Sequence, residues 1–314
     1  MNFSSNIYAH ADLEELEGFL RDDIHLIKRY PEPPSISLER MIAKRLDIAP
    51  NEVLVTSGAT DAIWLIAQTF RHKGTYKVFH PTFSEYEDAC RVFGYQTHPE
   101  ASLCWLCNPN NPTGEVLPEK ETLALAHKHE LLVIDQSYED YTLAKKLSAK
   151  DALRYGNIIQ VRSMTKSYAI PGLRLGFITA PADIISLLRS QYRPWTVNVF
   201  AMEAGKWLIG REKKAIPDLT AYLMEAQRLR TMLSGVKGLD VMETQTNFML
   251  CRMREGKAAD LKDELAIGHG MLIRDAANFK GLDERCFRVA AQWPEENDAL
   301  VEAITAYMEK KRYD

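Results

Sequence analysis

Short apolar runs of strand length alternate with longer, helix-patterned stretches through the first two thirds of the chain. This alternation predicts a mostly parallel β-sheet flanked by helices, because strand, helix and strand repeat along the chain in folds of that class. The candidate strands occupy residues 53–55, 77–79, 104–106, 131–134, 158–161 and 175–178. In open α/β sheets ligands gather at the carboxyl ends of the strands, so we expect functional side chains at those ends.

The pattern changes near residue 217. A long charged helix is predicted through residue 233, and strand-like runs follow at 246–250, 271–273 and 287–290. This mixture predicts a smaller α+β domain. We therefore expect a large domain over residues 30–216 and a small domain formed by residues 1–29 and 217–314. No internal repeat or flexible linker separates them, which favours close packing of the two.

The charge balance narrows the class of partner. The 314 residues carry 39 basic and 43 acidic side chains, mixed along the chain, for a formal net charge of −4. This balance argues against a nucleic-acid surface and favours a small molecule. No apolar run approaches the roughly 20 residues of a membrane helix, and the first residues lack a signal peptide's basic start and apolar centre. We expect a cytoplasmic protein.

The five cysteines predict neither a disulfide framework nor a metal site. Their number is odd for a framework of paired bridges. Cys104 and Cys107 form a C-x-x-C pair, but they lie in an apolar run that is typical of a buried strand. No second Cys or His pair at ligand spacing accompanies them, so we expect no bound metal.

Lys166 lies in a segment of unusual composition. Lys166 follows the hydroxyl residues Ser163 and Thr165 and precedes Arg174 by eight positions. A lysine amine forms an imine with an aldehyde once neighbouring charge and desolvation lower its pKa, while hydroxyls and a guanidinium hold a dianionic phosphate. The segment therefore suits a phosphorylated cofactor. Taken alone, an exposed lysine in a loop rich in serine and threonine explains it equally well.

A second phosphate-binding element follows the first candidate strand. Residues 56–60 form a small-residue turn, and a helix is predicted to begin there. The free N–H groups of a helix N-terminus, with the Thr60 hydroxyl, would bind a phosphate. The same pattern also begins many ordinary helices.

A buried acid is predicted at the end of another strand. Asp135 closes the apolar run 131–134, where a carboxylate is costly unless a cation or hydrogen-bond donor pairs with it. A protonated pyridine nitrogen would be such a partner. Asn111, in the turn-forming segment 108–114, and Tyr138 are then candidate hydrogen-bond partners of a phenolic oxygen on the same ring.

These segments, in this order along the chain, resemble a known family. Asn-Asn-Pro-Thr-Gly at 110–114, the strand-end Asp135 and the Ser-x-Thr-Lys…Gly-Leu-Arg-x-Gly segment at 163–176 resemble the fold type I pyridoxal-5'-phosphate (PLP) enzymes of aminotransferase class I/II. The resemblance implies PLP as cofactor, with Lys166 as its Schiff-base lysine and Asp135 as the partner of the pyridine nitrogen. It also implies that Asn111 and Tyr138 contact the phenolic oxygen.

The resemblance assigns further cofactor residues. Those implied to form the phosphate cup are Ala59, Thr60, Ser163, Thr165 and Arg174. Phe83 falls where this family stacks an aromatic ring on the cofactor, although a core phenylalanine would explain it equally well from the sequence alone. Tyr30 matches a tyrosine that reaches the cofactor phosphate of a neighbouring subunit, which implies a homodimer with shared active sites.

Segments outside the cofactor motifs narrow the resemblance to a subgroup. Residues 3–7, 168–174, 194–198 and 272–289 resemble the threonine-phosphate decarboxylases of cobalamin biosynthesis, relatives of histidinol-phosphate aminotransferase. That likeness implies that Arg274 and Arg288 bind the phosphate and carboxylate of a small substrate, with Asn6 and Asn247 completing the pocket. Surface ion pairing is the ordinary alternative for an arginine.

The reaction implied is decarboxylation of O-phospho-L-threonine to (R)-1-amino-2-propanol phosphate. The runner-up is a histidinol-phosphate-type aminotransferase, which would use the same cofactor cup and arginines. In either case the bond at Cα that stands perpendicular to the cofactor ring is the one that breaks. The side chains alone do not say whether that bond leads to the carboxylate or to the proton.

Overall fold

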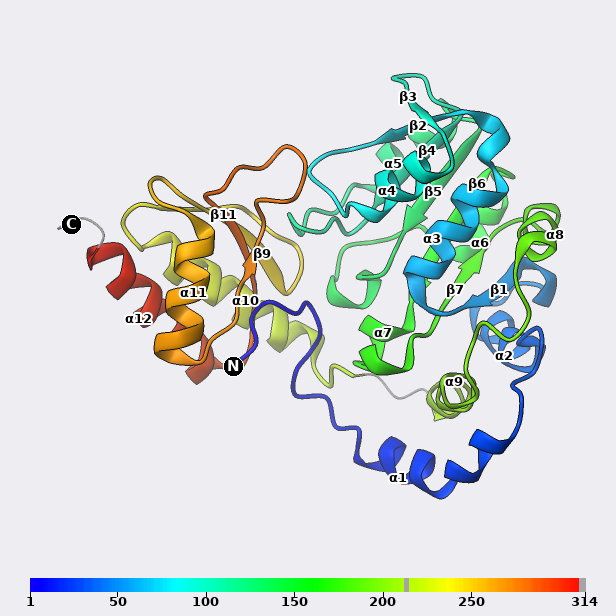
Figure 1. Cartoon of the computed structure of the whole chain (residues 1–314), viewed down its shortest axis with the longest axis horizontal. Helices are drawn as coiled ribbons and strands as arrows, with labels where there is room; N and C mark the ends of the chain where they lie inside the picture. Colours follow the sequence, from blue (N-terminus) through cyan, green and yellow to red (C-terminus); the bar gives the residue numbers. More distant parts are fainter. Residues whose placement is uncertain (212–214, 311–314) are drawn as a thin grey trace.

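The protein consists of two lobes, as a computed structural model describes it for residues 1–211 and 215–310 (Figure 1). The larger lobe is built on a seven-stranded sheet of order β1-β7-β6-β5-β4-β2-β3. Its strands are β1 (Val53–Thr56), β2 (Thr75–Val78), β3 (Gln96–Thr97), β4 (Leu103–Cys107), β5 (Leu131–Asp135), β6 (Ile158–Ser163) and β7 (Gly176–Thr179). β7 runs antiparallel to β1 and β6, while the pairs among β2 to β6 are parallel. The predicted mostly parallel sheet is confirmed.

Helices cover both faces of this sheet, which is why its central strands are continuous apolar runs. α3 (Gly58–Thr69), α4 (Glu85–Val92) and α8 (Ala182–Gln191) pack on one face around Ile63, Trp105 and Val133. α5 (Glu119–Ala126) and α6 (Ala149–Leu153) pack on the other. Cys104 and Cys107 belong to these opposite cores because positions three apart in a strand face opposite ways. The C-x-x-C spacing therefore does not bring the two thiols together.

A third apolar cluster lies at the edge of the large lobe. It joins α1 (Glu14–Asp22), α2 (Ile36–Leu46) and α9 (Val199–Arg211) around Leu16, Leu38 and Trp207. α1 thus packs with the large lobe, although the sequence assigned residues 1–29 to the small domain. The short helices of this lobe are η1 (Ile24–Lys28), η2 (Pro50–Glu52), η3 (Arg71–Lys73), η4 (Glu139–Tyr141), α7 (Met164–Ser167) and η5 (Pro171–Leu173).

The smaller lobe is a four-stranded antiparallel sheet of order β10-β11-β9-β8. Its strands are β8 (Leu239–Val241), β9 (Phe248–Met253), β10 (Arg274–Asp275) and β11 (Cys286–Ala290), and its helices are α10 (Leu219–Ser234), α11 (Ala258–His269) and α12 (Pro294–Lys310). Phe248, Phe287, Leu229 and Leu300 lie in the core between sheet and helices. The first residues of the chain join this lobe, because Phe3 N–H donates to the Leu272 carbonyl at 2.8 Å and Ala290 N–H donates to the Phe3 carbonyl at 2.9 Å.

Two predicted strand positions in the small lobe are wrong. The strand expected at 271–273 lies instead at Arg274–Asp275, because the main chain of Leu272 bonds to Met1 and Phe3 of the N-terminal segment. The strand expected from residue 246 begins at Phe248, whose carbonyl accepts hydrogen bonds from the Thr244 and Thr246 hydroxyls. β3 and β8 were not predicted.

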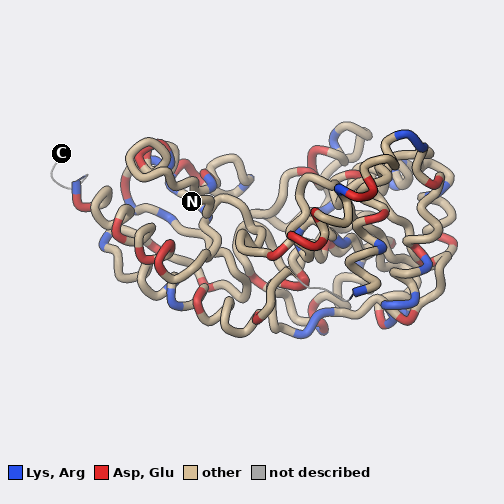
Figure 2. Tube along the Cα trace, turned by 90° about the horizontal axis from the view of Figure 1, so that it is seen from below, with Lys and Arg blue, Asp and Glu red and all other residues tan. Residues whose placement is uncertain are grey.

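Charged residues of both signs interleave along the chain trace (Figure 2). Among the described residues, no helix combines the length and apolar character needed to cross a membrane.

Candidate active site

A cavity with about 590 Å³ of empty space, part of it open to solvent, lies at the carboxyl ends of the central strands of the large sheet. It is lined by the first turn of α3, the start of α4 and the residues that end or follow β4, β5 and β6. The lining residues are Ala59, Thr60, Phe83, Tyr86, Cys107, Asn111, Asp135, Ser137, Tyr138, Ser163, Thr165, Lys166 and Arg174. Every cofactor-contacting residue expected from the sequence lines it except Tyr30.

Lys166 enters the cavity from α7, the single helical turn that follows β6. Its amine has no hydrogen bond among the described residues, and Nζ lies 5.8 Å from the centroid of the Tyr138 ring. Burial and the positive charges of Arg288 and Arg174 lower the pKa of Lys166 to about 8, against the opposing effect of Asp135. About a tenth of this amine is therefore neutral at pH 7, far more than for an ordinary lysine, and the neutral amine is the nucleophilic form.

Asp135 is buried at the end of β5 and accepts three hydrogen bonds. Tyr86 Oη donates to Oδ2 at 2.7 Å, and Ser137 donates to Oδ1 from its main-chain N at 2.9 Å and from Oγ at 2.5 Å. Burial raises the pKa of Asp135, while the hydrogen bonds from Ser137 and Tyr86 and the charge of Lys166 oppose that rise. The carboxylate is thus held in a fixed orientation toward the cavity that it lines.

The opposite end of the cavity gathers hydrogen-bond donors. α3 begins at Gly58 with φ of +84°, and a Cβ there would lie 2.8 Å from Nη2 of Arg174. A side chain at this position would displace the guanidinium from the helix N-terminus, where the first N–H groups have no partner within the helix, and the positive φ also favours glycine. The Thr165 hydroxyl is buried there without a hydrogen-bond partner. This set of donors fits a phosphate group.

Aromatic and amide side chains complete the walls. Tyr138 packs edge-on against Phe248, with centroids 5.0 Å apart, and burial raises its pKa to about 12. Its hydroxyl is thus a hydrogen-bond donor at neutral pH. Asn111 Oδ1 accepts a hydrogen bond from Arg288, and Phe83 lies edge-on to Tyr86 at 5.8 Å.

The predicted substrate arginines occupy paired positions on neighbouring strands. Arg288 on β11 is directly opposite Arg274 on β10. The Arg288 guanidinium is buried, donates to Asn111 Oδ1 and, at 2.7 Å, to the Ser4 carbonyl, and leaves Nε without a partner. Burial lowers the pKa of Arg288 to about 10. Arg274 is less buried, donates to Asn278 Oδ1 at 2.8 Å and lies over the Phe279 ring at 5.5 Å.

Two buried asparagines carry unsatisfied amide atoms. Asn6 has no hydrogen bond to either amide atom, and Asn247 donates to the Tyr222 hydroxyl at 3.0 Å but leaves Oδ1 unpaired. Together with Arg288 Nε and Thr165 Oγ1, these two residues account for five of the seven buried side-chain polar atoms without a partner in the described chain. Unpaired buried polar groups are costly, so their concentration here indicates that ligands pair with them.

Tyr30 lies apart from this cavity. Its side chain is 85% exposed and packs against Trp195, with ring centroids 5.4 Å apart. The structure therefore brings together all the predicted cofactor residues of one subunit and leaves Tyr30 on the surface.

The cavity also contains residues that the sequence did not predict. Tyr86 and Ser137 are the two that hydrogen-bond Asp135. Their signal was weak: Tyr86 follows Phe83 by three positions at the start of a helix, and Ser137 follows Asp135 by two. Neither spacing distinguishes them from ordinary core and turn residues.

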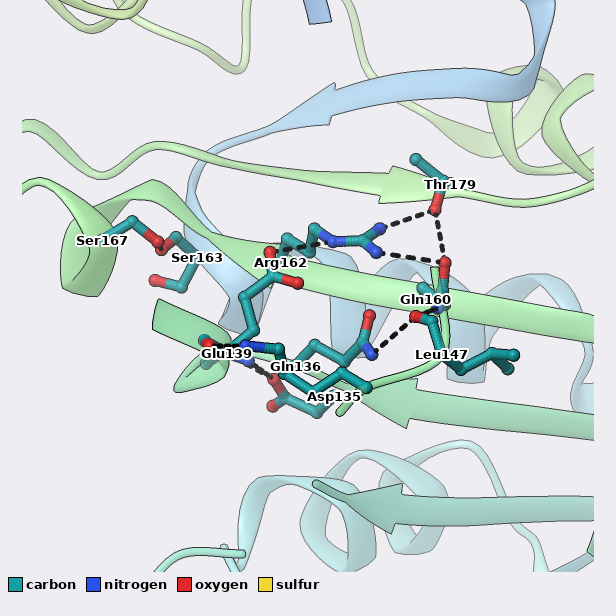
Figure 3. Close-up of polar contacts among 11 residues, drawn as sticks. Asp135, Gln136, Glu139, Leu147, Gln160, Arg162, Ser163, Ser167 and Thr179 are labelled. Atoms are coloured by element: carbon teal, nitrogen blue, oxygen red, sulfur yellow. Dashed lines mark hydrogen bonds and ion pairs between the residues drawn. The ribbon is translucent and has the colours of Figure 1, made fainter. Parts of the chain in front are cut away.

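Arg162, next to the predicted Ser163, belongs to the sheet rather than to the cavity (Figure 3). Its guanidinium donates to Glu139 at 2.9 Å, to Thr179 at 2.9 Å and to Gln160 at 3.2 Å. These bonds join β6 and β7 to η4 behind the site. Because its donors are occupied in this way, Arg162 is not a phosphate-binding group, and Arg174 is the arginine that lines the cavity.

The described residues contain no cluster of three or more His, Cys, Asp or Glu side chains suited to a metal ion. All five cysteines are buried and unpaired.

Fold and site together define a two-lobed α/β enzyme whose cavity is lined by a half-buried lysine, a buried acid and a group of donors suited to a phosphate. The chain belongs to the aminotransferase class I and II family, whose sequence model matches residues 1–103 and 95–304. The predicted family and its PLP dependence are thus confirmed.

Individual relatives support the same family. The L-threonine-O-3-phosphate decarboxylase of Porphyromonas gingivalis is 35% identical, with a TM-score of 0.94 over 98% of this chain and 99% of that one. The threonine-phosphate decarboxylase of Salmonella typhimurium is 29% identical over 97% of this chain and 90% of its own. A histidinol-phosphate aminotransferase of Desulfitobacterium hafniense is 27% identical over 88% of this chain and 83% of its own.

Proposed function

We propose that this enzyme decarboxylates O-phospho-L-threonine to (R)-1-amino-2-propanol phosphate with PLP as cofactor. The observation that carries the proposal is the pair Arg274 and Arg288, opposite each other on β10 and β11, with the unpaired amides of Asn6 and Asn247. A substrate with a carboxylate and a phosphate brings two anions, and these arginines supply a second anion-binding region in addition to the donors around Arg174. The likeness to the Porphyromonas gingivalis decarboxylase extends over 98% of this chain and supports the same substrate.

The cofactor residues have distinct tasks in this proposal. Lys166 would hold the cofactor covalently through its side-chain amine. Thr60, Thr165, Ser163 and Arg174, with the N–H groups from Ala59 onward, bind its phosphate. Asp135 pairs with the pyridine nitrogen, and Asn111 and Tyr138 hydrogen-bond the phenolic oxygen. Phe83 packs on the ring. The bound cofactor supplies an electron-accepting ring that stabilises negative charge at the substrate Cα.

The substrate residues decide which bond breaks. In this proposal Arg288, which contacts the cavity residue Asn111, holds the substrate carboxylate together with Asn6 and Asn247, and the less buried Arg274 holds the substrate phosphate. If these groups hold the carboxylate perpendicular to the cofactor ring, carbon dioxide would leave and a proton would take its place at Cα. If they hold the Cα proton there, Lys166 removes it and the enzyme is an aminotransferase of the histidinol-phosphate type.

The first test is incubation of the purified enzyme with O-phospho-L-threonine in the absence of any 2-oxo acid. Decarboxylation predicts continuous release of carbon dioxide and accumulation of the aminopropanol phosphate. A single equivalent of converted cofactor without carbon dioxide would favour the aminotransferase instead.

We also propose that the protein is a homodimer with shared active sites and that it is located in the cytoplasm. Ile24, Ile27, Tyr30 and Trp195 are exposed by 51–85%, an apolar surface suited to a second copy of the chain. Tyr30 would then serve the site of the neighbouring subunit. The five unpaired cysteines fit a reducing compartment. Light scattering should give the mass of two chains, and Tyr30→Phe should weaken cofactor binding; a monomer that is fully active would contradict both statements.

A further inference from the structure

Tyr141 joins two segments of the site through its hydroxyl. The side chain is wholly buried at the end of η4, three residues after Tyr138. Its Oη accepts a hydrogen bond from the main-chain N–H of Tyr8 at 2.9 Å and donates one to the main-chain carbonyl of Lys166 at 3.0 Å. A single phenol oxygen thus connects the N-terminal segment to the residue that holds the cofactor.

The N-terminal segment is fixed at two points, and a proposed substrate residue lies between them. Its start is bound to the small lobe by the main-chain hydrogen bonds of Phe3. Its other end is bound at Tyr8 by the Tyr141 hydroxyl. Between them, the Ser4 carbonyl accepts from Arg288, and Asn6 lies buried with both amide atoms unpaired. In Figure 1 this segment leaves the small lobe and runs past α7 toward α1.

The Lys166 carbonyl has two hydrogen-bond donors. α7 is only one turn long, so its carbonyls rely on the N–H groups of the residues that follow the helix. The Lys166 carbonyl accepts one long bond, from Ala169 N–H at 3.3 Å, and the Tyr141 hydroxyl supplies a shorter one. Burial raises the pKa of Tyr141 far above its ordinary value, so the hydroxyl keeps its proton.

The packing of the Tyr141 ring can be tested separately from the hydrogen bonds of its hydroxyl. The ring packs in the same apolar cluster as Phe3, Tyr138 and Phe248, and its centroid is 6.3 Å from that of Tyr138. A phenylalanine would keep this packing. What the tyrosine adds is therefore the pair of hydrogen bonds.

We propose that Tyr141 is a positioning residue whose hydroxyl holds the Asn6-bearing segment in register with the main chain of Lys166. The tether follows from the contacts of the chain itself, and its effect on substrate binding rests on the proposed function. Without the hydroxyl, Asn6 loses its fixed distance from the cofactor lysine, so substrate binding weakens while cofactor attachment persists.

The experiment compares Tyr141→Phe with Tyr95→Phe in the cofactor-loaded enzyme. Tyr95 is a matched control, because it is also buried and its hydroxyl also donates to a main-chain carbonyl, that of Ala67 in α3, at 3.0 Å. Hydrogen exchange in a peptide covering residues 3–12 should accelerate about five- to tenfold in Tyr141→Phe, the effect of one ordinary hydrogen bond. It should stay at the wild-type rate in Tyr95→Phe.

Kinetics supply the second readout. Tyr141→Phe should raise KM for O-phospho-L-threonine by about five- to tenfold, with a smaller change in kcat and an unchanged visible cofactor spectrum. Wild-type exchange in Tyr141→Phe, or equal acceleration in Tyr95→Phe, would overturn the proposal. The exchange measurement needs no substrate, so if the wild type fails to turn over phosphothreonine, the tether is still tested and only the proposed reaction fails.

Discussion

The two ends of the active site differ in how far their polar groups are already paired. At the cofactor end, Asp135 accepts three hydrogen bonds and Gly58 lets Arg174 approach the start of α3. At the substrate end, Asn6 has two unpaired amide atoms and Asn247 and Arg288 have one each. Because an unpaired buried polar atom costs about 1–3 kcal/mol, the substrate end is the part of the molecule with most to gain from a ligand.

This difference separates two kinds of failure. Changes at the cofactor end should abolish or weaken retention of the cofactor, which is visible as absorbance. Changes at the substrate end should leave that absorbance intact and raise KM.

Lys166→Ala should remove the visible absorbance of the cofactor and lower activity by about 10⁴-fold or more, because no other amine is expected to hold the cofactor covalently. Absorbance spectra and turnover measure both effects. Lys262→Ala, which changes an exposed lysine on α11, should be indistinguishable from the wild type. Survival of the absorbance band in Lys166→Ala would disprove the role of this lysine.

Arg288→Lys should raise KM by about 30-fold or more while the cofactor spectrum is retained. A lysine keeps the positive charge but loses the forked geometry that reaches Asn111, the Ser4 carbonyl and a carboxylate together. The matched control is Arg254→Lys, at an exposed ion pair with Asp240. A loss of cofactor without a change in KM would place Arg288 at the cofactor end instead.

Gly58→Ala should weaken cofactor affinity by about tenfold or more, since a Cβ would lie 2.8 Å from the Arg174 guanidinium. Gly94 has nearly the same φ, +80°, but nothing within 4 Å of an added Cβ. Gly94→Ala thus carries the conformational penalty without the contact. Equal cofactor dissociation constants in the two variants would contradict the role of the Arg174 contact.

The pH dependence of cofactor attachment should report the pKa of Lys166. Because that pKa is lowered to about 8, the fraction of neutral amine should increase about tenfold per pH unit below pH 8 and level off above it. The rate at which the cofactor attaches should follow this fraction. Stopped-flow mixing of the apoprotein with PLP measures this rate. A rate that continues to rise toward pH 10 would show that the lysine has an ordinary pKa.

The sequence was most informative where function depends on short segments. Lys166, Thr165 and Arg174 lie within nine residues of one another, and Asp135 ends an apolar strand, so both the cofactor and the parallel sheet were predictable. The pairing of Tyr86 with Asp135 spans 49 residues and that of Tyr141 with Tyr8 spans 133. Such contacts depend on tertiary packing, which local patterns do not encode.

The same reason explains the displaced strand in the small lobe. The run 271–273 is apolar and strand-like, but the main chain of Leu272 is engaged by Met1 and Phe3 from the far end of the sequence. The ladder with β11 therefore begins at Arg274, which places this arginine directly opposite Arg288. The arginine pair that carries the proposed function is thus a consequence of a contact that periodicity alone does not reveal.

The most direct test of the proposed reaction is to follow both candidate bonds at Cα in a single experiment. The enzyme is incubated in D₂O with O-phospho-L-threonine labelled with ¹³C in its carboxyl group, and ¹³CO₂ and the deuterium content of remaining substrate are measured together. The account predicts stoichiometric ¹³CO₂ without deuterium in the recovered substrate. Deuterium at Cα with the labelled carboxyl group retained would contradict it and identify an enzyme that removes the proton.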